Sequence, residues 1–201
     1  MKTVFFHGDR SKKKIAITFD DGPSRECWGI LKVLKKEKVP ATFFVIGKKI
    51  RKNGKILKQM IKQGCEIGNH TYNHARLLLK SQKKMEKEIV DTDNELKRLK
   101  IKTNLMRCPY FTCGIGALIA AKRLKKKIIF ADIDGRDWMT SKKRLVKKVL
   151  RRVKNGSIIC LHSYLEDIGH NRDIVKVTKK VIPKLKGMGY KLVTVSEVIK
   201  E

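Results

Sequence analysis

The stretch Ile15-Ala16-Ile17-Thr18-Phe19-Asp20-Asp21-Gly22-Pro23-Ser24 joins an apolar, β-branched run to two adjacent carboxylates and a Gly-Pro turn. Residues 15–19 have the composition of a buried strand. Buried carboxylates without a partner are costly, so a strand that ends in Asp20 and Asp21 indicates a cation near its tip. Successive strand residues point to opposite sides, and the two carboxylates would therefore face different groups, one a metal ion and the other a water molecule. The alternative is a turn or a helix cap, since Asp is favoured in both, and this stretch alone does not separate the two interpretations.

The length and composition predict one globular domain that spans residues 1–201. Hydrophobic residues make up 41% of the 201-residue chain, which is enough for a sizeable core. We expect no membrane span, because no apolar run approaches the ~20 residues that a bilayer requires. Residues 1–7 begin like a signal peptide but are followed by Asp9 before an adequate apolar core. The chain as given would thus be cytoplasmic, whereas a longer natural protein would be compatible with secretion or a cell-wall location.

The formal net charge of +30 predicts attraction to polyanions. Anionic cell-surface polymers and nucleic acid are the two partner classes. The excess is scattered in short lysine runs, such as Lys12–Lys14 and Lys125–Lys127. Specific base reading favours arginine, whose planar fork bonds guanine at two points. We therefore expect a solvated basic surface and no specific nucleic-acid partner.

Strand and helix patterns alternate along the whole chain. The expected strands cover residues 15–19, 41–47, 65–69, 103–108, 127–133, 157–161 and 190–194. The expected helices cover residues 27–37, 48–63 with a break at Asn53-Gly54, 81–99, 115–124, 141–153, 172–187 and 195–200. This alternation predicts parallel βαβ units. About seven units favour a closed or nearly closed TIM-like barrel over an open sheet, although spacing alone does not exclude the open sheet.

Chemically active residues follow several of these strands. In a parallel barrel all the carboxyl ends of the strands lie on one face, where such enzymes build their sites. His70 and His74 are four residues apart, a spacing at which two imidazoles can bind one ion. Together with Asp21 they would form a site with an open position for water. Zinc suits these nitrogen and oxygen ligands, and other divalent metals are alternatives.

The remaining residues on this face complete a hydrolytic site. Asp20 would accept a proton from water, and His162 would protonate the leaving group. Asp134 would orient His162, and Arg107 would pair with Asp20. This set of residues predicts metal-assisted hydrolysis of an acyl group.

These residues lie in motifs that resemble those of the polysaccharide deacetylase family, carbohydrate esterase family 4. Residues 18–24 and 70–74 match its first two motifs, and residues 107–110, 134–138 and 158–162 are similar to the third, fourth and fifth. The resemblance implies a distorted (β/α)7 barrel with parallel strands. It also implies metal-dependent removal of N-acetyl, and sometimes O-acetyl, groups from sugars such as those of peptidoglycan or chitin. Zinc is the expected metal, with cobalt and nickel as alternatives.

The resemblance also assigns a role to individual residues. The metal ligands would be Asp21, His70 and His74. The catalytic residues would be Asp20 as base, Arg107 as its positioning partner, the backbone of Tyr110 at the oxyanion, and His162 as acid with Asp134 beside it. The substrate-binding residues would be Pro109, Trp138 and Cys160.

Three positions depart from the family pattern. Phe111 stands where the third motif usually has Gly, and Ala131 stands where a Trp often precedes the fourth motif. Cys160 takes the place of an apolar pocket residue in the fifth. These departures leave the catalytic set intact but alter the cleft. Hydrolysis of a small-molecule amide is therefore kept as an alternative, and a basic nucleic-acid-binding protein is a third hypothesis that rests on charge alone.

Overall fold

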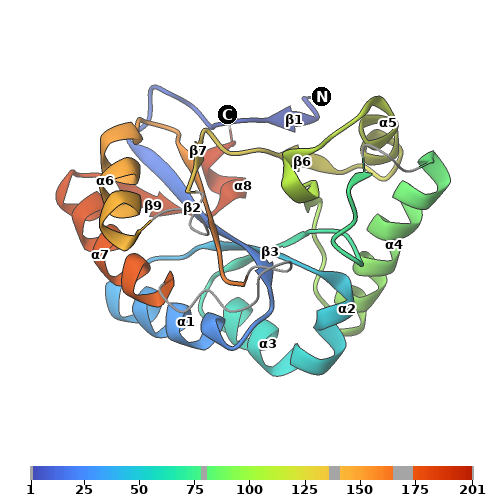
Figure 1. The fold of residues 1–201 in the computed structure, drawn as a ribbon, viewed down its shortest axis with the longest axis horizontal. Helices are drawn as coiled ribbons and strands as arrows, with labels where there is room; N and C mark the ends of the chain where they lie inside the picture. The colour runs from blue at the N-terminus through green and yellow to red at the C-terminus, as the bar shows by residue number, and fades with distance from the viewer. Residues whose placement is uncertain (1, 78–80, 136–140, 165–173, 201) are drawn as a thin grey trace.

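The computed structural model describes residues 2–77, 81–135, 141–164 and 174–200 (Figure 1). Its centre is a sheet in which every strand pairing is parallel. The strands in the described ranges are β1 (Val4–Phe5), β2 (Lys14–Gly22), β3 (Thr42–Val45), β4 (Glu66–Asn69), β5 (Leu105–Met106), β6 (Lys127–Ile129), β7 (Ile133–Asp134), β8 (Ile158–His162) and β9 (Lys191–Val193). Their order is β1-β6-β5-β4-β3-β2-β8-β7, with β9 beside β2. This arrangement is the distorted parallel barrel that the sequence predicts.

Helices surround the sheet (Figure 1). They are α1 (Glu26–Glu37), α2 (Gly47–Ile50), α3 (Gly54–Lys62), α4 (Gln82–Arg98), α5 (Ile115–Arg123), α6 (Lys142–Arg152), α7 (Ile174–Gly187) and α8 (Val195–Val198), with short 3-10 turns η1 (Arg51–Asn53) and η3 (Pro109–Phe111). The expected break at Asn53-Gly54 separates η1 from α3. None of the helices in the described ranges combines the length and the hydrophobicity that a membrane crossing requires.

Strand β2 is the centre of the sheet, because it pairs with β3, β8 and β9. Its side chains alternate between two hydrophobic layers, as a strand requires. Ile15, Ile17 and Phe19 pack with the outer helices, whereas Ala16 packs inside the barrel. Asp20 has the same parity as Ala16, so the alternation carries its carboxylate into the interior at the carboxyl end of the strand.

The expected strand over residues 127–133 is wrong as one element, because it is divided into β6 and β7 at opposite ends of the sheet order. The physical reason is Asp132, whose carboxylate accepts hydrogen bonds from the backbone N–H of Ile158 at 2.8 Å and from the Ser157 hydroxyl at 2.9 Å. It also pairs with Arg10 at 2.9 Å. Residues 130–132 thus cross from one end of the sheet order to the other. The hydrophobic pattern of the segment carries no sign of this crossing.

The first strand was not predicted from the sequence. Strand β1 has only two residues, and it pairs with β6 through Val4 opposite Ile128 and Phe5 opposite Ile129. Two residues are too few to show a periodic pattern in the sequence. The position of β1 is instead determined by its pairing with the edge of β6. Part of the helix expected over residues 172–187 lies outside the described residues, and α7 is described from Ile174.

Replacing Asp132 with Ala will destabilise the fold by about 1–3 kcal/mol, because the N–H of fully buried Ile158 loses its acceptor. Asp132→Asn keeps one acceptor oxygen and will cost less. Urea denaturation followed by circular dichroism measures both changes. Asp91→Ala is the matched control, since Asp91 pairs with Lys87 at 2.8 Å on the surface and its loss will cost less than about 1 kcal/mol. Equal stabilities of Asp132→Ala and the control would contradict the role of Asp132.

Candidate active site

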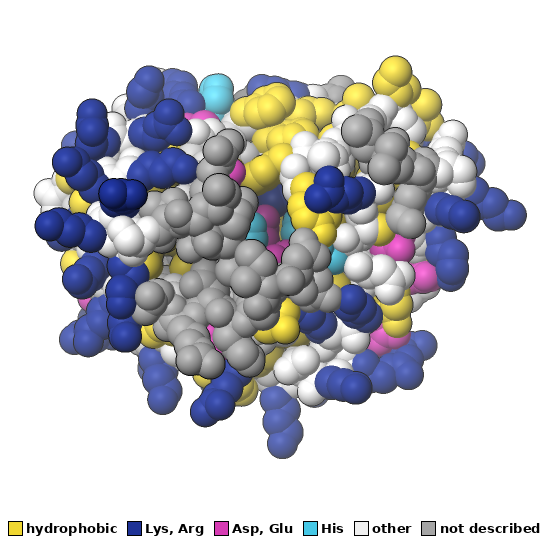
Figure 2. All heavy atoms as spheres, viewed as in Figure 1, with side chains coloured by type: hydrophobic (Ala, Val, Ile, Leu, Met, Phe, Trp, Pro, Cys, Tyr) yellow, Lys and Arg dark blue, Asp and Glu magenta, His cyan; other side chains and the backbone are white. Residues whose placement is uncertain are grey.

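The expected catalytic residues meet at the carboxyl ends of β2, β4, β5 and β8. Figure 2 shows acidic and histidine side chains within a hollow near the centre of this face. Each residue lies where the hydrogen-bonded pairing of its strand ends, because the backbone beyond that point is free to turn. The convergence that the sequence predicts for Asp20, Asp21, His70 and Arg107 is present in the structure.

The backbone around the hollow is strained. Positive φ angles occur at Asp21 (65°), Thr71 (64°), His74 (59°), Tyr110 (57°) and Phe111 (53°). A non-glycine residue in this region costs about 1–3 kcal/mol. These strained residues lie next to three strand ends. Their side chains are therefore held in position at the expense of local stability, which is typical of a functional site.

A metal-binding geometry is formed by Asp21, His70 and His74. The Nε2 atoms of both imidazoles face one oxygen of Asp21, at 3.3 Å for His70 and 3.1 Å for His74. All three side chains are buried. Donor atoms bound to one tetrahedral zinc at about 2.0–2.1 Å lie about 3.3 Å apart. The two distances to Asp21 are close to this separation, and the three donor atoms lie within 4.8 Å of one another, so the side chains fit the ligand set of a single divalent ion.

The backbone fixes the protonation of His70. Its Nδ1 lies 2.8 Å from the carbonyl oxygen of Arg107, and because a carbonyl only accepts, Nδ1 must carry the proton. Nε2 then faces the Asp21 oxygen either with a second proton or with a cation between them. A carbonyl partner on the second ring nitrogen is the usual way in which a metal-bound histidine is held.

Asp21 is a carboxylate anion in this site. Burial alone would raise the pKa of Asp21, but hydrogen bonds from His70 and His74 and the charges of His70 and His162 outweigh it. The pKa of Asp21 consequently lies well below its ordinary value. An ionised carboxylate is the form that binds a metal ion.

Asp20 forms a fully enclosed ion pair with Arg107. Nη1 of Arg107 lies 2.7 Å from Oδ1 of Asp20 and also donates to the Thr18 hydroxyl at 2.7 Å. The guanidinium donates further to the carbonyl oxygens of Ile129 and Phe130, at 3.0 and 3.3 Å. Arg107 is 0% exposed. These contacts leave the guanidinium little freedom, so one oxygen of Asp20 is held in place and the other faces the site.

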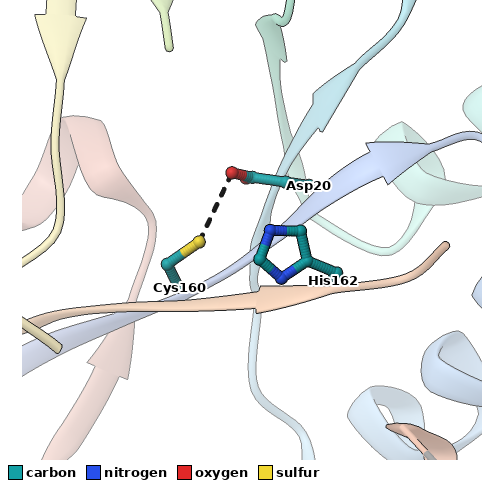
Figure 3. Close-up of side chains that lie close together, drawn as sticks. All are labelled: Asp20, Cys160 and His162. Atoms are coloured by element: carbon teal, nitrogen blue, oxygen red, sulfur yellow. Dashed lines mark hydrogen bonds between the residues drawn. The ribbon is translucent and has the colours of Figure 1, made fainter. Parts of the chain in front are cut away.

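The second oxygen of Asp20 faces the side chain of Cys160, which projects from the neighbouring strand β8 (Figure 3). The Cys160 thiol donates to Oδ2 at 3.3 Å, and Asp20 is paired with His162 in the ladder. Donor atoms of Asp20, Cys160 and His162 all lie within 4.8 Å of one another. The sequence predicts that Cys160 contacts the substrate. In the structure its thiol donates to Asp20, and a role in substrate binding stays a prediction.

Two supporting residues were not identified from the sequence. The Thr18 hydroxyl joins Arg107 to the carbonyl oxygen of Ile159, at 2.9 Å from the latter. Ser163 binds the backbone carbonyl of Asp20 through its N–H at 3.0 Å and its hydroxyl at 2.9 Å. Thr18 lies inside the first motif and Ser163 directly follows the fifth, so the sequence locates both residues. Only the fold shows which groups they contact.

The remaining predicted residues occupy different parts of the site. Tyr110 is 39% exposed, and its ring centroid lies 4.7 Å from that of His74. Pro109 is buried at the start of η3. Asp134 ends β7 opposite Cys160, which brings it next to the strand that carries His162. Trp138 lies outside the described residues.

Together, the barrel and the site define a metal-dependent hydrolase. A family model described as polysaccharide deacetylase matches residues 7–129. A peptidoglycan-N-acetylglucosamine deacetylase of Bacillus cereus is 35% identical, with 94% of this chain and 90% of that protein covered. The chain therefore belongs to the polysaccharide deacetylase family and is a hydrolase of that class.

Two further relatives agree with this assignment. The peptidoglycan-N-acetylmuramic acid deacetylase PdaC of Bacillus subtilis is 35% identical over 94% of this chain, which corresponds to 39% of that protein. The crystal structure of the Bc1960 peptidoglycan N-acetylglucosamine deacetylase, in complex with 4-naphthalen-1-yl-N-oxidanyl-benzamide, superposes with a TM-score of 0.93 at 32% identity. That match covers 98% of this chain and 93% of the solved one.

Removing the partner of Asp20 will be costly. Arg107→Leu will destabilise the protein by about 3–5 kcal/mol, because it leaves a buried carboxylate without its countercharge. The double variant Asp20→Asn, Arg107→Leu will lose about 1–3 kcal/mol less than the sum of the two single changes. Urea denaturation of the four proteins gives this coupling free energy. Strict additivity would show that the two side chains do not depend on each other.

Proposed function

We propose that this chain removes N-acetyl groups from N-acetylglucosamine units of a peptidoglycan- or chitin-type glycan, and that residues 1–201 act as one catalytic domain. The observation that carries the proposal is the position of the Asp21, His70 and His74 cluster next to the Asp20–Arg107 pair. A metal-ligand set and a fixed carboxylate then share one pocket, with Oδ2 of Asp20 only 3.9 Å from Nε2 of His70. The substrates named for the relatives support the choice of glycan.

The proposed metal is zinc, with cobalt or nickel as substitutes, held by Asp21, His70 and His74. Two imidazole nitrogens and one carboxylate oxygen are a common catalytic zinc set, with a position left for water. When bound, such an ion supplies the Lewis acidity that makes water nucleophilic near neutral pH.

The side chains divide the proton transfers between them. Asp20 takes a proton from the water whose oxygen attacks the acetyl carbonyl carbon, and Arg107 keeps the carboxylate oriented for this step. The C–N bond then breaks, and His162 gives its proton to the leaving amine. Acetate and a free amino sugar are the products. Asp134 on the neighbouring strand orients His162 in this proposal.

The carbonyl oxygen of the acetyl group becomes negatively charged when water attacks, and a hydrogen-bond donor is needed to stabilise it. We assign this role to the backbone N–H of Tyr110 in η3, since the ring of this residue lies next to that of His74. Pro109, Trp138 and Cys160 complete the proposed substrate-binding set.

Acetate release from N-acetylglucosamine oligomers tests the proposal, using metal-stripped protein to which zinc, cobalt or nickel is restored. Activity will depend on the metal, and Asp20→Asn will lower kcat by about 10²–10⁴-fold, because it removes the base. The same variant will keep its metal, as measured by elemental mass spectrometry.

His74→Ala is the comparison variant, since it will lose both metal and activity. Acetate release that persists without metal would contradict the proposal. Metal binding with no release from any sugar, but with hydrolysis of a simple aryl acetamide, would favour the small-molecule amide alternative.

We also propose anionic cell-surface polymers as a partner, and α6 as their contact surface. Every charged residue of α6 is a lysine or an arginine. Its outer side forms a groove of about 430 Å³ lined by Arg144, Lys147, Lys148, Arg151 and Arg152. The Lys148 amine donates to the carbonyl oxygen of Gly135 at 3.3 Å, which ties this surface to the segment that carries Asp134.

Binding to immobilised polyglycerol phosphate will weaken steeply as salt is raised, because screening acts on exposed charges. The triple variant Arg144→Gln, Lys147→Gln, Arg151→Gln will bind more weakly than a control with the same charge loss on α3. That control is Lys55→Gln, Lys58→Gln, Lys62→Gln. An equal loss in both would mean that net charge alone acts, and tighter binding to duplex DNA of equal charge would favour nucleic acid.

A further inference from the structure

Three neighbouring strands each lead into a phenylalanine at the catalytic face. In the order β1-β6-β5, Phe6 directly follows β1, Phe130 directly follows β6, and Phe111 lies in η3 beyond β5. Arg107 directly follows β5 in the same order, and Asp20, Asp21, His70 and His162 lie at the ends of β2, β4 and β8. Figure 2 shows hydrophobic side chains gathered over β1 and β6 along the rim of the hollow. The phenylalanines thus lie on the β1, β6 and β5 side of the active face, and Phe111 lies next to Arg107.

The three rings form a stacked row. The centroids of Phe6 and Phe130 lie 4.7 Å apart with an interplanar angle of 17°, and those of Phe130 and Phe111 lie 5.9 Å apart at 23°. At its inner end, Cζ of Arg107 lies 5.6 Å from the centroid of Phe111. Since Arg107 holds Asp20, the row runs from the partner of the catalytic carboxylate towards the outer rim.

Stability does not account for this row. Phe6 is 55% exposed, although a buried ring would contribute far more to the fold. Phe111 has a φ of 53°, a conformation that glycine adopts without strain and that costs a β-carbon-bearing residue about 1–3 kcal/mol. The family motif has Gly at this position, so the aromatic ring is present despite a conformational cost.

A small residue adjoins the row in the sequence. Ala131 replaces the Trp that often stands in the family, and it immediately follows Phe130. The small side chain is half-buried and packs against the interior cluster.

From these observations we propose that the exposed ring of Phe6, backed by the stacked rings of Phe130 and Phe111, binds a sugar ring of the same glycan chain, beyond the unit that is deacetylated. The negative face of an aromatic ring attracts the partially positive C–H groups on the apolar face of a pyranose. Stacking covers the ring faces inside the row, so the exposed ring of Phe6 is the surface offered to a pyranose, and it needs no hydrogen bond to a particular hydroxyl. The proposal rests on the proposed function, and it predicts that oligomers long enough to reach the row are better substrates than short ones.

The test compares KM for N-acetylglucosamine oligomers, from the dimer to the hexamer, in wild type and Phe6 variants. Phe6→Ala will raise KM for the hexamer by about fivefold to tenfold, the change expected for loss of one half-exposed aromatic contact. The KM for the dimer and kcat for both will stay within about twofold. Phe6→Trp will keep the preference for long chains, whereas Phe6→Leu will lose it, because only the aromatic variant preserves stacking.

Met188→Ala is the matched control, since Met188 is 41% exposed and follows α7 on another part of the chain. It will leave the chain-length preference unchanged. An unchanged hexamer KM in Phe6→Ala, or an equal rise for the dimer, would overturn the proposal.

A binding measurement separates this inference from the proposed function. Calorimetric titration of the hexamer and the dimer into Asp20→Asn, with and without Phe6→Ala, needs no turnover. If wild type releases no acetate but hexamer affinity still depends on Phe6, the aromatic site stands while the deacetylase proposal falls. If hexamer and dimer bind with equal affinity in the presence of Phe6, the aromatic site falls whatever the activity.

Discussion

The buried ion pair between Asp20 and Arg107 is the contact on which the site depends. Arg107 is fully enclosed, and its guanidinium also donates to Thr18 and to the carbonyls of Ile129 and Phe130 at the end of β6. A buried guanidinium is tolerated only when nearly all its donors are satisfied. The pair therefore joins the central strand to the far side of the sheet, and it places one carboxylate oxygen in a fixed position while the other remains available. The carbonyl of the same residue contacts the His70 ring, so one arginine orients both Asp20 and a member of the Asp21, His70 and His74 cluster.

Two kinds of constraint meet at the catalytic face. Parallel pairing brings the strand ends together without specifying their chemistry. Positive φ angles then turn Asp21 and His74 towards each other, at a local energetic cost that the large core offsets. This division explains how a stable barrel carries a strained site, because the core residues and the catalytic residues lie on different segments of each strand.

Much of this arrangement was accessible from the sequence. The buried run over residues 15–19, the alternation of strands and helices and the His70–His74 spacing are local patterns, and they predicted the barrel and the convergence of the metal ligands. The division of residues 127–133 was not accessible, because it depends on Asp132 contacting Ile158, which is distant in the chain. Strand β1 was missed for a similar reason, since two residues contain no periodicity. The contact of Cys160 with Asp20 also requires the register between β2 and β8.

The crossing formed by residues 130–132 has a consequence for how this enzyme can diversify. Asp132 is anchored by Ile158 and Ser157, while the Phe130 carbonyl is held by Arg107. An insertion or deletion in this span would displace either the aromatic side or the β7 side of the face. Position 131 lies between the two anchors, and its side chain lines the interior without a polar contact to maintain. A substitution at this position would thus change the packing against the inner cluster without removing either polar anchor.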